Sequence, residues 1–254
     1  MSRVDFIGVG PGDPELITVA GLAALREARA VLAPALFAKV FGPELAGKEV
    51  ASPFQMTHES VVEWVEARLR RSPVAFLVPG DFSLFCPFQS FVTQFGERAR
   101  IIPGVGTHAA AAAVLKKTFD VPGVAHATVL TSPRAVAAEG RVRLRDYARP
   151  GHTLLLYMID LPLPELVAEL HAGFGRDTPI AILEQLSCPE ERVTRGRLSD
   201  ICERVGERDP FGLRSRSREP ALAIVVAGDV LEAEEDPSWW NRRHERIWKP
   251  RGVE

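Results

Sequence analysis

Three glycine-containing loops carry the strongest chemical signal in this chain of 254 residues. The first is Gly8-Val9-Gly10-Pro11-Gly12-Asp13-Pro14, at the end of the apolar segment 4–9. Glycine permits positive φ and a close approach of a ligand to the backbone, and α/β folds bind ligands at the carboxyl ends of their strands. The dinucleotide fingerprint G-x-G-x-x-G is excluded, because position 13 is Asp13 and two prolines obstruct the helix entry. A tight turn without a ligand remains the alternative.

The other two loops have the same character. Pro79-Gly80-Asp81-Phe82-Ser83 follows the apolar segment 74–78, and Pro103-Gly104-Val105-Gly106-Thr107 leads into an alanine-rich stretch. Two Gly-Asp loops therefore follow two strands of one sheet, at the edge where α/β folds bind ligands, and their recurrence is more informative than either loop alone. For the third loop, a tightly packed helix is the alternative.

The elements that must position these loops alternate between strands and helices in the first half of the chain. Such alternation favours a mostly parallel α/β sheet. Ser60 followed by Glu63 predicts a capping box at the start of one helix. The expected strands are 4–9, 30–33, 74–78 and 101–102, and the expected helices are 18–28, 60–71, 85–95 and 107–117.

A break at Asp120-Val121-Pro122-Gly123 predicts a domain boundary. We therefore expect an N-terminal α/β domain over 1–120, a C-terminal α/β domain over 121–232, and a tail over 233–254 with Trp239, Trp240 and Trp248 among arginines. The second half has fewer crossover helices, which favours a mixed sheet. Its expected strands are 127–130, 153–157, 180–184 and 221–227, and its expected helices are 163–170 and 198–205.

Composition narrows the functional classes. With 31 Lys and Arg against 33 Asp and Glu, the net charge of −2 lacks the global positive field that favours nucleic acid as a partner. The chain has three cysteines without a CxxC pair, Cys86, Cys188 and Cys202. We therefore expect neither disulfides nor a zinc site. A reducing cytoplasm is the expected location. No apolar run reaches about 18 residues, so we expect no membrane span and no signal peptide.

In their order, these motifs resemble the tetrapyrrole (corrin/porphyrin) methylases, the S-adenosylmethionine-dependent enzymes of cobalamin and sirohaem synthesis. The resemblance extends to about residue 230 and is nearest to the precorrin-4 C11-methyltransferase branch. The segments that carry it are Ile7 to Thr18, Met56-Thr57, Pro103-Gly104-Val105, Asp177-Thr178-Pro179-Ile180 and Ser187-Cys188-Pro189-Glu190-Glu191.

The resemblance implies two α/β domains with S-adenosylmethionine in the cleft between them, usually in a homodimer. It also implies a small-molecule acceptor, a polycarboxylate tetrapyrrole such as precorrin-4. It assigns no catalytic residue; His58, His108, Glu184 or water are candidates for accepting a proton. The implied cofactor contacts are Pro11, Pro79, Gly80, Asp81, Leu84, Gly106, Thr107, Met158, Leu186, Ala221 and Leu222.

The chain departs from the family pattern in its second loop. Phe82 stands where the family has proline, and Phe85 stands where the branch usually has tyrosine. Two alternatives therefore stay open: a divergent relative that methylates another kind of acceptor, and a non-catalytic module that binds S-adenosylmethionine.

Two arginine-rich segments offer contacts for an acceptor with many carboxylates. Guanidinium groups match carboxylates in a bidentate way, whereas a solvated arginine face is the alternative. We expect Arg141, Arg143 and Arg145 to bind the acceptor, with Arg214, Arg216 and Arg218 as a second run.

Overall fold

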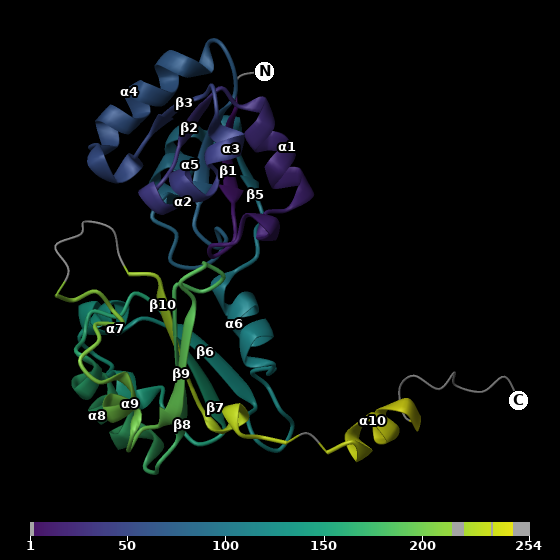
Figure 1. Cartoon of the computed structure of the whole chain (residues 1–254), viewed down its shortest axis with the longest axis vertical. Helices are drawn as coiled ribbons and strands as arrows, with labels where there is room; N and C mark the ends of the chain where they lie inside the picture. The colour runs from purple at the N-terminus through teal and green to yellow at the C-terminus, as the bar shows by residue number, and fades with distance from the viewer. Residues whose placement is uncertain (1–2, 215–220, 235, 246–254) are drawn as a thin grey trace, which may run out of the picture.

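A computed structural model describes residues 3–214, 221–234 and 236–245. Two five-stranded sheets lie one above the other along the long axis of the molecule (Figure 1). The first sheet is wholly parallel and the second is mixed. The predicted fold class, two α/β domains of these two kinds, is confirmed.

The first sheet places the carboxyl ends of its strands toward the second half of the molecule (Figure 1). Its order is β3-β2-β4-β1-β5. The central strands β1 and β4 are buried throughout, because helices cover both faces of a parallel sheet. The bounds are β1 (Val4–Gly8), β2 (Ala30–Leu32), β3 (Glu49–Ala51), β4 (Val74–Val78) and β5 (Ala99–Ile102).

Helices on the two faces of this sheet bury separate apolar clusters. Val61 and Val65 pack against Phe76 on one face, and Leu25 packs with Ile7 and Leu77 on the other. The helices are α1 (Val19–Glu27), α2 (Ala35–Val40), α3 (Gly42–Leu45), α4 (His58–Leu69) and α5 (Gln89–Phe95), with short 3-10 turns η1 (Pro14–Leu16), η2 (Pro53–Gln55) and η3 (Gly96–Arg98).

Two predicted helix starts are wrong. Helix α4 begins at His58 and not at Ser60, because the Thr57 hydroxyl accepts a hydrogen bond from the Ser60 N–H and is the N-cap. Helix α5 begins at Gln89 and not at Phe85, because Phe85 has φ of 53°, which no right-handed helix contains.

The second sheet has the order β6-β7-β10-β8-β9, in which only β6 and β7 pair in parallel. Strand β9 was not predicted from the sequence, because it is an edge strand whose arginines point to solvent. The strands are β6 (Ala127–Thr131), β7 (His152–Leu156), β8 (Pro179–Glu184), β9 (Arg192–Arg197) and β10 (Ala223–Ala227). The remaining elements are α7 (Pro133–Glu139), η4 (Leu144–Asp146), α8 (Leu163–Phe174), α9 (Ile201–Val205), η5 (Asp229–Leu231) and α10 (Ser238–Arg243).

Helix α6 (Thr107–Leu115) links the two halves. Ala111 and Leu115 share an apolar cluster with Leu155 and Leu183 of the second sheet, so α6 packs on that sheet although it precedes residue 120. The domain bounds given above stay a prediction. Helix α10, with Trp239 and Trp240, lies apart from both sheets (Figure 1), and Trp248 is outside the described residues.

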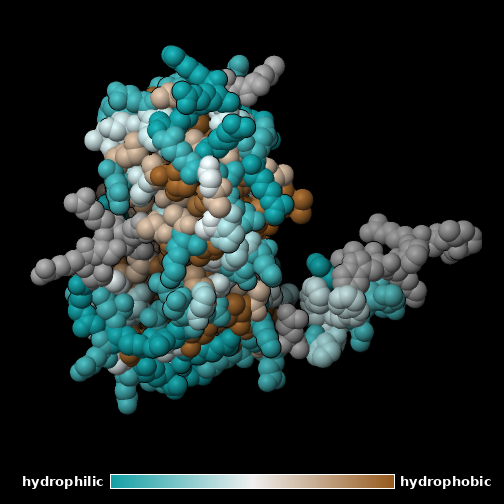
Figure 2. Space-filling view, turned by 45° about the horizontal axis from the view of Figure 1, so that its top comes forward, coloured by the Kyte–Doolittle hydropathy of each residue, from teal (hydrophilic) through white to brown (hydrophobic). Residues whose placement is uncertain are grey.

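Figure 2 shows a largely hydrophilic face on which the apolar side chains form separate patches. Within the described part of the chain, no helix has the length and apolar character needed to cross a membrane.

Candidate active site

The carboxyl ends of β1, β4 and β5 bring the three glycine loops into direct contact. The Gly10 N–H donates to the Gly80 carbonyl at 3.0 Å, and the Gly80 N–H donates to the Gly10 carbonyl at 2.8 Å. A Cβ on Gly104 would lie 2.4 Å from the Gly80 carbonyl oxygen and 2.5 Å from the Gly8 carbonyl carbon. Only a residue without a side chain lets these three backbones meet, which is why glycine recurs here.

The second half of the chain closes against the first loop. A Cβ on Gly12 would lie 2.5 Å from Cys188 Sγ and 2.8 Å from the Leu186 carbonyl oxygen. The Gln185 N–H in turn donates to the Leu222 carbonyl at 2.8 Å. Three segments that are far apart in sequence therefore meet at the junction of the two halves.

Helix α6 joins the second and third loops at its first turn. A Cβ on Gly80 would lie 3.1 Å from Thr107 Oγ1, and one on Gly106 would lie 3.4 Å from Asp81 Oδ1 and 2.6 Å from His108 Cε1. The imidazole of His108 therefore fills the space beside Gly106. A side chain at position 106 would collide with this ring, which explains why the residue is glycine.

The loops at this junction hold strained backbone. Phe85, Met158, Gln185 and Ser187 have φ between 45° and 64°, a region that side-chain-bearing residues rarely adopt. Such conformations concentrate at binding and catalytic sites, where the surrounding structure enforces them. All four are in or directly beside the predicted contacts, which include Leu84, Met158 and Leu186.

Of the predicted contacts, most lie at this junction. Pro11 is buried, and Met158 is 43% exposed at the end of β7. Leu84 is half-buried in the second loop, and Ala221 is exposed and lies against Gly212. The positions of the contacts are thus known, whereas their role in binding stays a prediction.

Tyr157 is a residue of this site that the sequence reasoning missed. Its ring lies 5.0 Å from that of Phe85, centroid to centroid, and its hydroxyl is buried without a hydrogen-bond partner. Burial, together with the charge of Asp81, raises the pKa of Tyr157 far above its usual value, so the hydroxyl stays protonated. Its place at the end of a strand, directly before Met158, was the available signal.

The three protein groups considered as proton acceptors have different surroundings. The Glu184 carboxylate accepts from Arg208, whose guanidinium also donates to Thr194 at 2.8 Å. The His58 ring stacks on Phe91 at 4.5 Å, beside the core of the first sheet. His108 alone of the three lies where the loops meet, and its Nδ1 is buried without a partner.

The arginines of the two runs also differ in their surroundings. Arg145 forms an ion pair with Glu169 of α8, which engages its guanidinium within the protein. Arg141 and Arg143 have exposed side chains. In the second run, the Arg214 guanidinium donates to the Glu207 carbonyl at 2.5 Å, and positions 216 and 218 lie outside the described residues.

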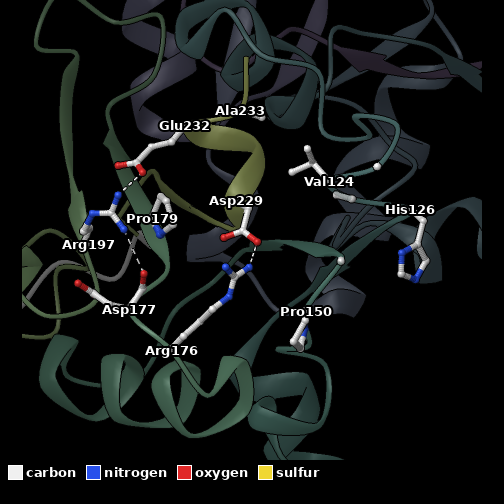
Figure 3. A pocket seen from close by; sticks show the side chains of 13 residues that line it. Val124, His126, Pro150, Arg176, Asp177, Pro179, Arg197, Asp229, Glu232 and Ala233 are labelled. Carbon is white, nitrogen blue, oxygen red and sulfur yellow. Dashed lines mark hydrogen bonds and ion pairs between the residues drawn. The ribbon is translucent and has the colours of Figure 1, made fainter. Parts of the chain in front are cut away.

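A cavity of about 900 Å³ lies elsewhere, at the end of the second sheet where β7 and β8 begin. Figure 3 shows the side chains that line it. Its guanidinium groups are already paired, Arg176 with Asp229 and Arg197 with Glu232. None of the predicted site residues lines it. We therefore place the candidate site at the glycine loops, where strained backbone lies together with the unpaired polar atoms of His108 and Tyr157.

Comparison with known proteins gives two consistent results. The chain is 32% identical to a precorrin-4 C(11)-methyltransferase of Pseudomonas aeruginosa, with 97% of this chain and 98% of the relative covered. It is 29% identical to a cobalt-precorrin-4 C(11)-methyltransferase of Methanocaldococcus jannaschii, covering 90% and 88%.

Solved structures agree. A cobalt precorrin-4 methyltransferase superposes with a TM-score of 0.72 at 26% identity, covering 91% of this chain and 97% of the other. A uroporphyrin-III C-methyltransferase from Thermus thermophilus, complexed with S-adenosylhomocysteine, gives a TM-score of 0.68 at 27% identity, covering 91% and 99%. The resemblance inferred from the motifs is confirmed. Since the sequence profile of the family also matches residues 3–202, the chain belongs to the tetrapyrrole (corrin/porphyrin) methylases.

Proposed function

We propose that this protein transfers a methyl group from S-adenosylmethionine to C11 of precorrin-4 or its cobalt complex, in cobalamin biosynthesis. Membership of the family makes it an S-adenosylmethionine-dependent methyltransferase, as expected from the motifs. The observation that carries the proposal is the meeting of three glycine loops with the loops of the second half, in a chain that matches precorrin-4 methyltransferases over nearly its full length.

The residues at the junction fit the cofactor. Gly10, Gly80 and Gly104 let the three loops pack backbone against backbone at the junction. The Asp81 carboxylate, which accepts a hydrogen bond from Ser83, adds a negative charge there that suits a cationic ligand. We propose that Pro11, Pro79, Gly80, Asp81, Leu84, Gly106, Thr107, Met158, Leu186, Ala221 and Leu222 hold the cofactor. When bound, S-adenosylmethionine supplies an electrophilic methyl group on a sulfonium.

The chain's own contribution is mainly positioning. Holding two reactants in line supplies about 7–11 kcal/mol of a barrier, and the junction offers walls from both halves for that purpose. His108 is the titratable group best placed to take up the proton that the acceptor loses, because Glu184 is held by Arg208 and His58 lies on Phe91.

One departure from the family pattern has a structural reason. The ring of Phe82 makes an edge-to-face contact with Phe6, with centroids 5.9 Å apart, at the core of the first sheet. Phe82 therefore anchors the second loop and leaves Asp81 at the junction, which supports retention of the family's cofactor. A non-tetrapyrrole acceptor and a non-catalytic module remain the rival functions.

We further infer that the protein works as a homodimer in the cytoplasm, on a small molecule and on neither nucleic acid nor a membrane. The free thiols of its three cysteines suit a reducing compartment.

The acceptor class is tested through Arg141 and Arg143. In the presence of S-adenosylhomocysteine, the double variant Arg141→Ala/Arg143→Ala is expected to bind a corrin or porphyrin polycarboxylate about three- to tenfold more weakly. Exposed ion pairs contribute about 0.2–1 kcal/mol each, and tenfold corresponds to about 1.4 kcal/mol. Fluorescence or absorbance titration at low and moderate salt measures this, and wild-type affinity should fall with salt.

Arg145→Ala is the matched control, because Glu169 already engages that guanidinium. Equal acceptor affinity in the wild type and the double variant, without salt dependence, would assign these arginines to a solvated face. Failure of any tetrapyrrole to bind would favour the non-tetrapyrrole acceptor.

A further inference from the structure

Among the described residues, four buried side-chain polar atoms have no hydrogen-bond partner: Ser52 Oγ, Arg68 Nε, His108 Nδ1 and Tyr157 Oη. The last two belong to neighbouring residues, because the phenol of Tyr157 approaches the backbone of His108 at the first turn of α6. The His108 ring itself lies beside Gly106. A buried polar group without a partner costs folding free energy. Two such groups on neighbouring residues at the junction of the loops indicate that a ligand completes them.

Tyr157 is held in place by its backbone and by its ring. The backbone N–H of Tyr157 donates to the Thr131 carbonyl at 2.9 Å, which ties the residue to the edge of the second sheet. Its ring contacts Phe85 from the second loop and packs on the apolar cluster that includes α6. The hydroxyl is therefore held inside the junction rather than at the surface.

The surroundings also define which chemical group the hydroxyl can bind. Because the phenol stays protonated, it is a donor and requires an oxygen or nitrogen acceptor. The nearby Asp81 carboxylate repels a second carboxylate, since like charges in a partly buried site are unfavourable. The fitting partner is thus an uncharged acceptor atom.

We propose that Tyr157 donates a hydrogen bond to a ribose hydroxyl of the bound S-adenosyl group, beside His108. This assignment rests on the proposed function. Ribose hydroxyls are uncharged, whereas a polycarboxylate acceptor presents mainly charged oxygens. The neighbours of Tyr157 include Asp81 and Met158, which are residues expected to hold the cofactor. This favours the cofactor over the acceptor as the source of that oxygen.

The test is calorimetric titration of S-adenosylhomocysteine into the wild type and Tyr157→Phe, which removes only the hydroxyl and keeps the ring on Phe85. We expect affinity to fall about three- to tenfold, as for loss of one hydrogen bond. The chain has one other tyrosine, Tyr147, which is partly buried and packs against the core of the second sheet. Tyr147→Phe is therefore the matched control and should bind as the wild type does.

Ribose-deoxy analogues of S-adenosylhomocysteine, lacking the 2′- or the 3′-hydroxyl, identify the partner. The wild type should bind one of these analogues more weakly than S-adenosylhomocysteine, by the same factor that Tyr157→Phe costs. Tyr157→Phe should bind that analogue and S-adenosylhomocysteine equally well, since variant and analogue remove the same hydrogen bond. Without ligand, Tyr157→Phe should melt no lower than the wild type, because an unpaired buried hydroxyl is lost.

Equal binding of S-adenosylhomocysteine by the wild type and Tyr157→Phe would overturn the assignment and leave the proposed function intact. If Tyr157→Phe and the missing hydroxyl reduced affinity independently for both analogues, so that the two factors multiply, the assignment would also be overturned. The same holds if Tyr157→Phe weakened binding of the acceptor and left cofactor affinity unchanged. No binding by the wild type would overturn the proposed function as well.

Discussion

Valine in place of Gly80 or Gly10 is expected to abolish S-adenosylhomocysteine binding, by at least about a hundredfold, in a protein that still folds. Both glycines have positive φ, 65° and 79°, and they pair with each other through two backbone hydrogen bonds. A side chain at position 80 would press on Thr107 Oγ1 at 3.1 Å, and one at position 10 would meet Leu16 Cβ at 2.8 Å. A branched residue would therefore shift the loops that face the ligand.

Gly47→Val is the control for the effect of backbone strain at a positive φ. Gly47 has φ of 75°, is exposed, and has no heavy atom within 4 Å of a built Cβ. This variant carries the same backbone penalty of about 1–2 kcal/mol, but it should bind S-adenosylhomocysteine normally. Normal calorimetric binding by folded Gly10→Val and Gly80→Val would mean that these loops are ordinary turns.

S-Adenosylhomocysteine should raise the melting temperature of the wild type by about 5–10 °C at a hundredfold excess over its dissociation constant. A ligand that binds only the folded state then adds about 2.7 kcal/mol, and each kcal/mol shifts the midpoint of a chain of this size by about 2–4 °C. Differential scanning calorimetry measures the shift, and Gly80→Val should show none. A wild type without heat of binding or thermal shift at millimolar ligand would remove the methyltransferase function.

The sequence predicted the parts of the fold that depend on local pattern. Strand β4 (Val74–Val78) was predicted with its observed bounds, because it is a continuous apolar run between turn residues. The edge strand β9 was missed, since its arginines obscure any apolar alternation. The start of α5 was misplaced because tertiary contacts hold Phe85 at positive φ, which no local propensity foretells.

The candidate site, too, could be predicted from the sequence only in part. The first two loops could be placed together from the sequence, because each follows a strand that ends at the same edge of a parallel sheet. The third loop was added to them by the family resemblance, and β5 indeed pairs in parallel with β1. The pairing of Arg145 with Glu169 and of Glu184 with Arg208 could not, because each joins residues 24 positions apart through packing of separate elements. The buried hydroxyl of Tyr157 likewise became visible only with its neighbours in place.

The central claim is tested most directly by incubating the protein with methyl-labelled S-adenosylmethionine and precorrin-4 or cobalt-precorrin-4, and following the label by chromatography and NMR. The account predicts label at C11 of the corrin precursor, with one S-adenosylhomocysteine formed for each methyl group transferred. A protein that binds S-adenosylhomocysteine but transfers no label to precorrin-4, its cobalt complex or any other tetrapyrrole precursor would contradict it.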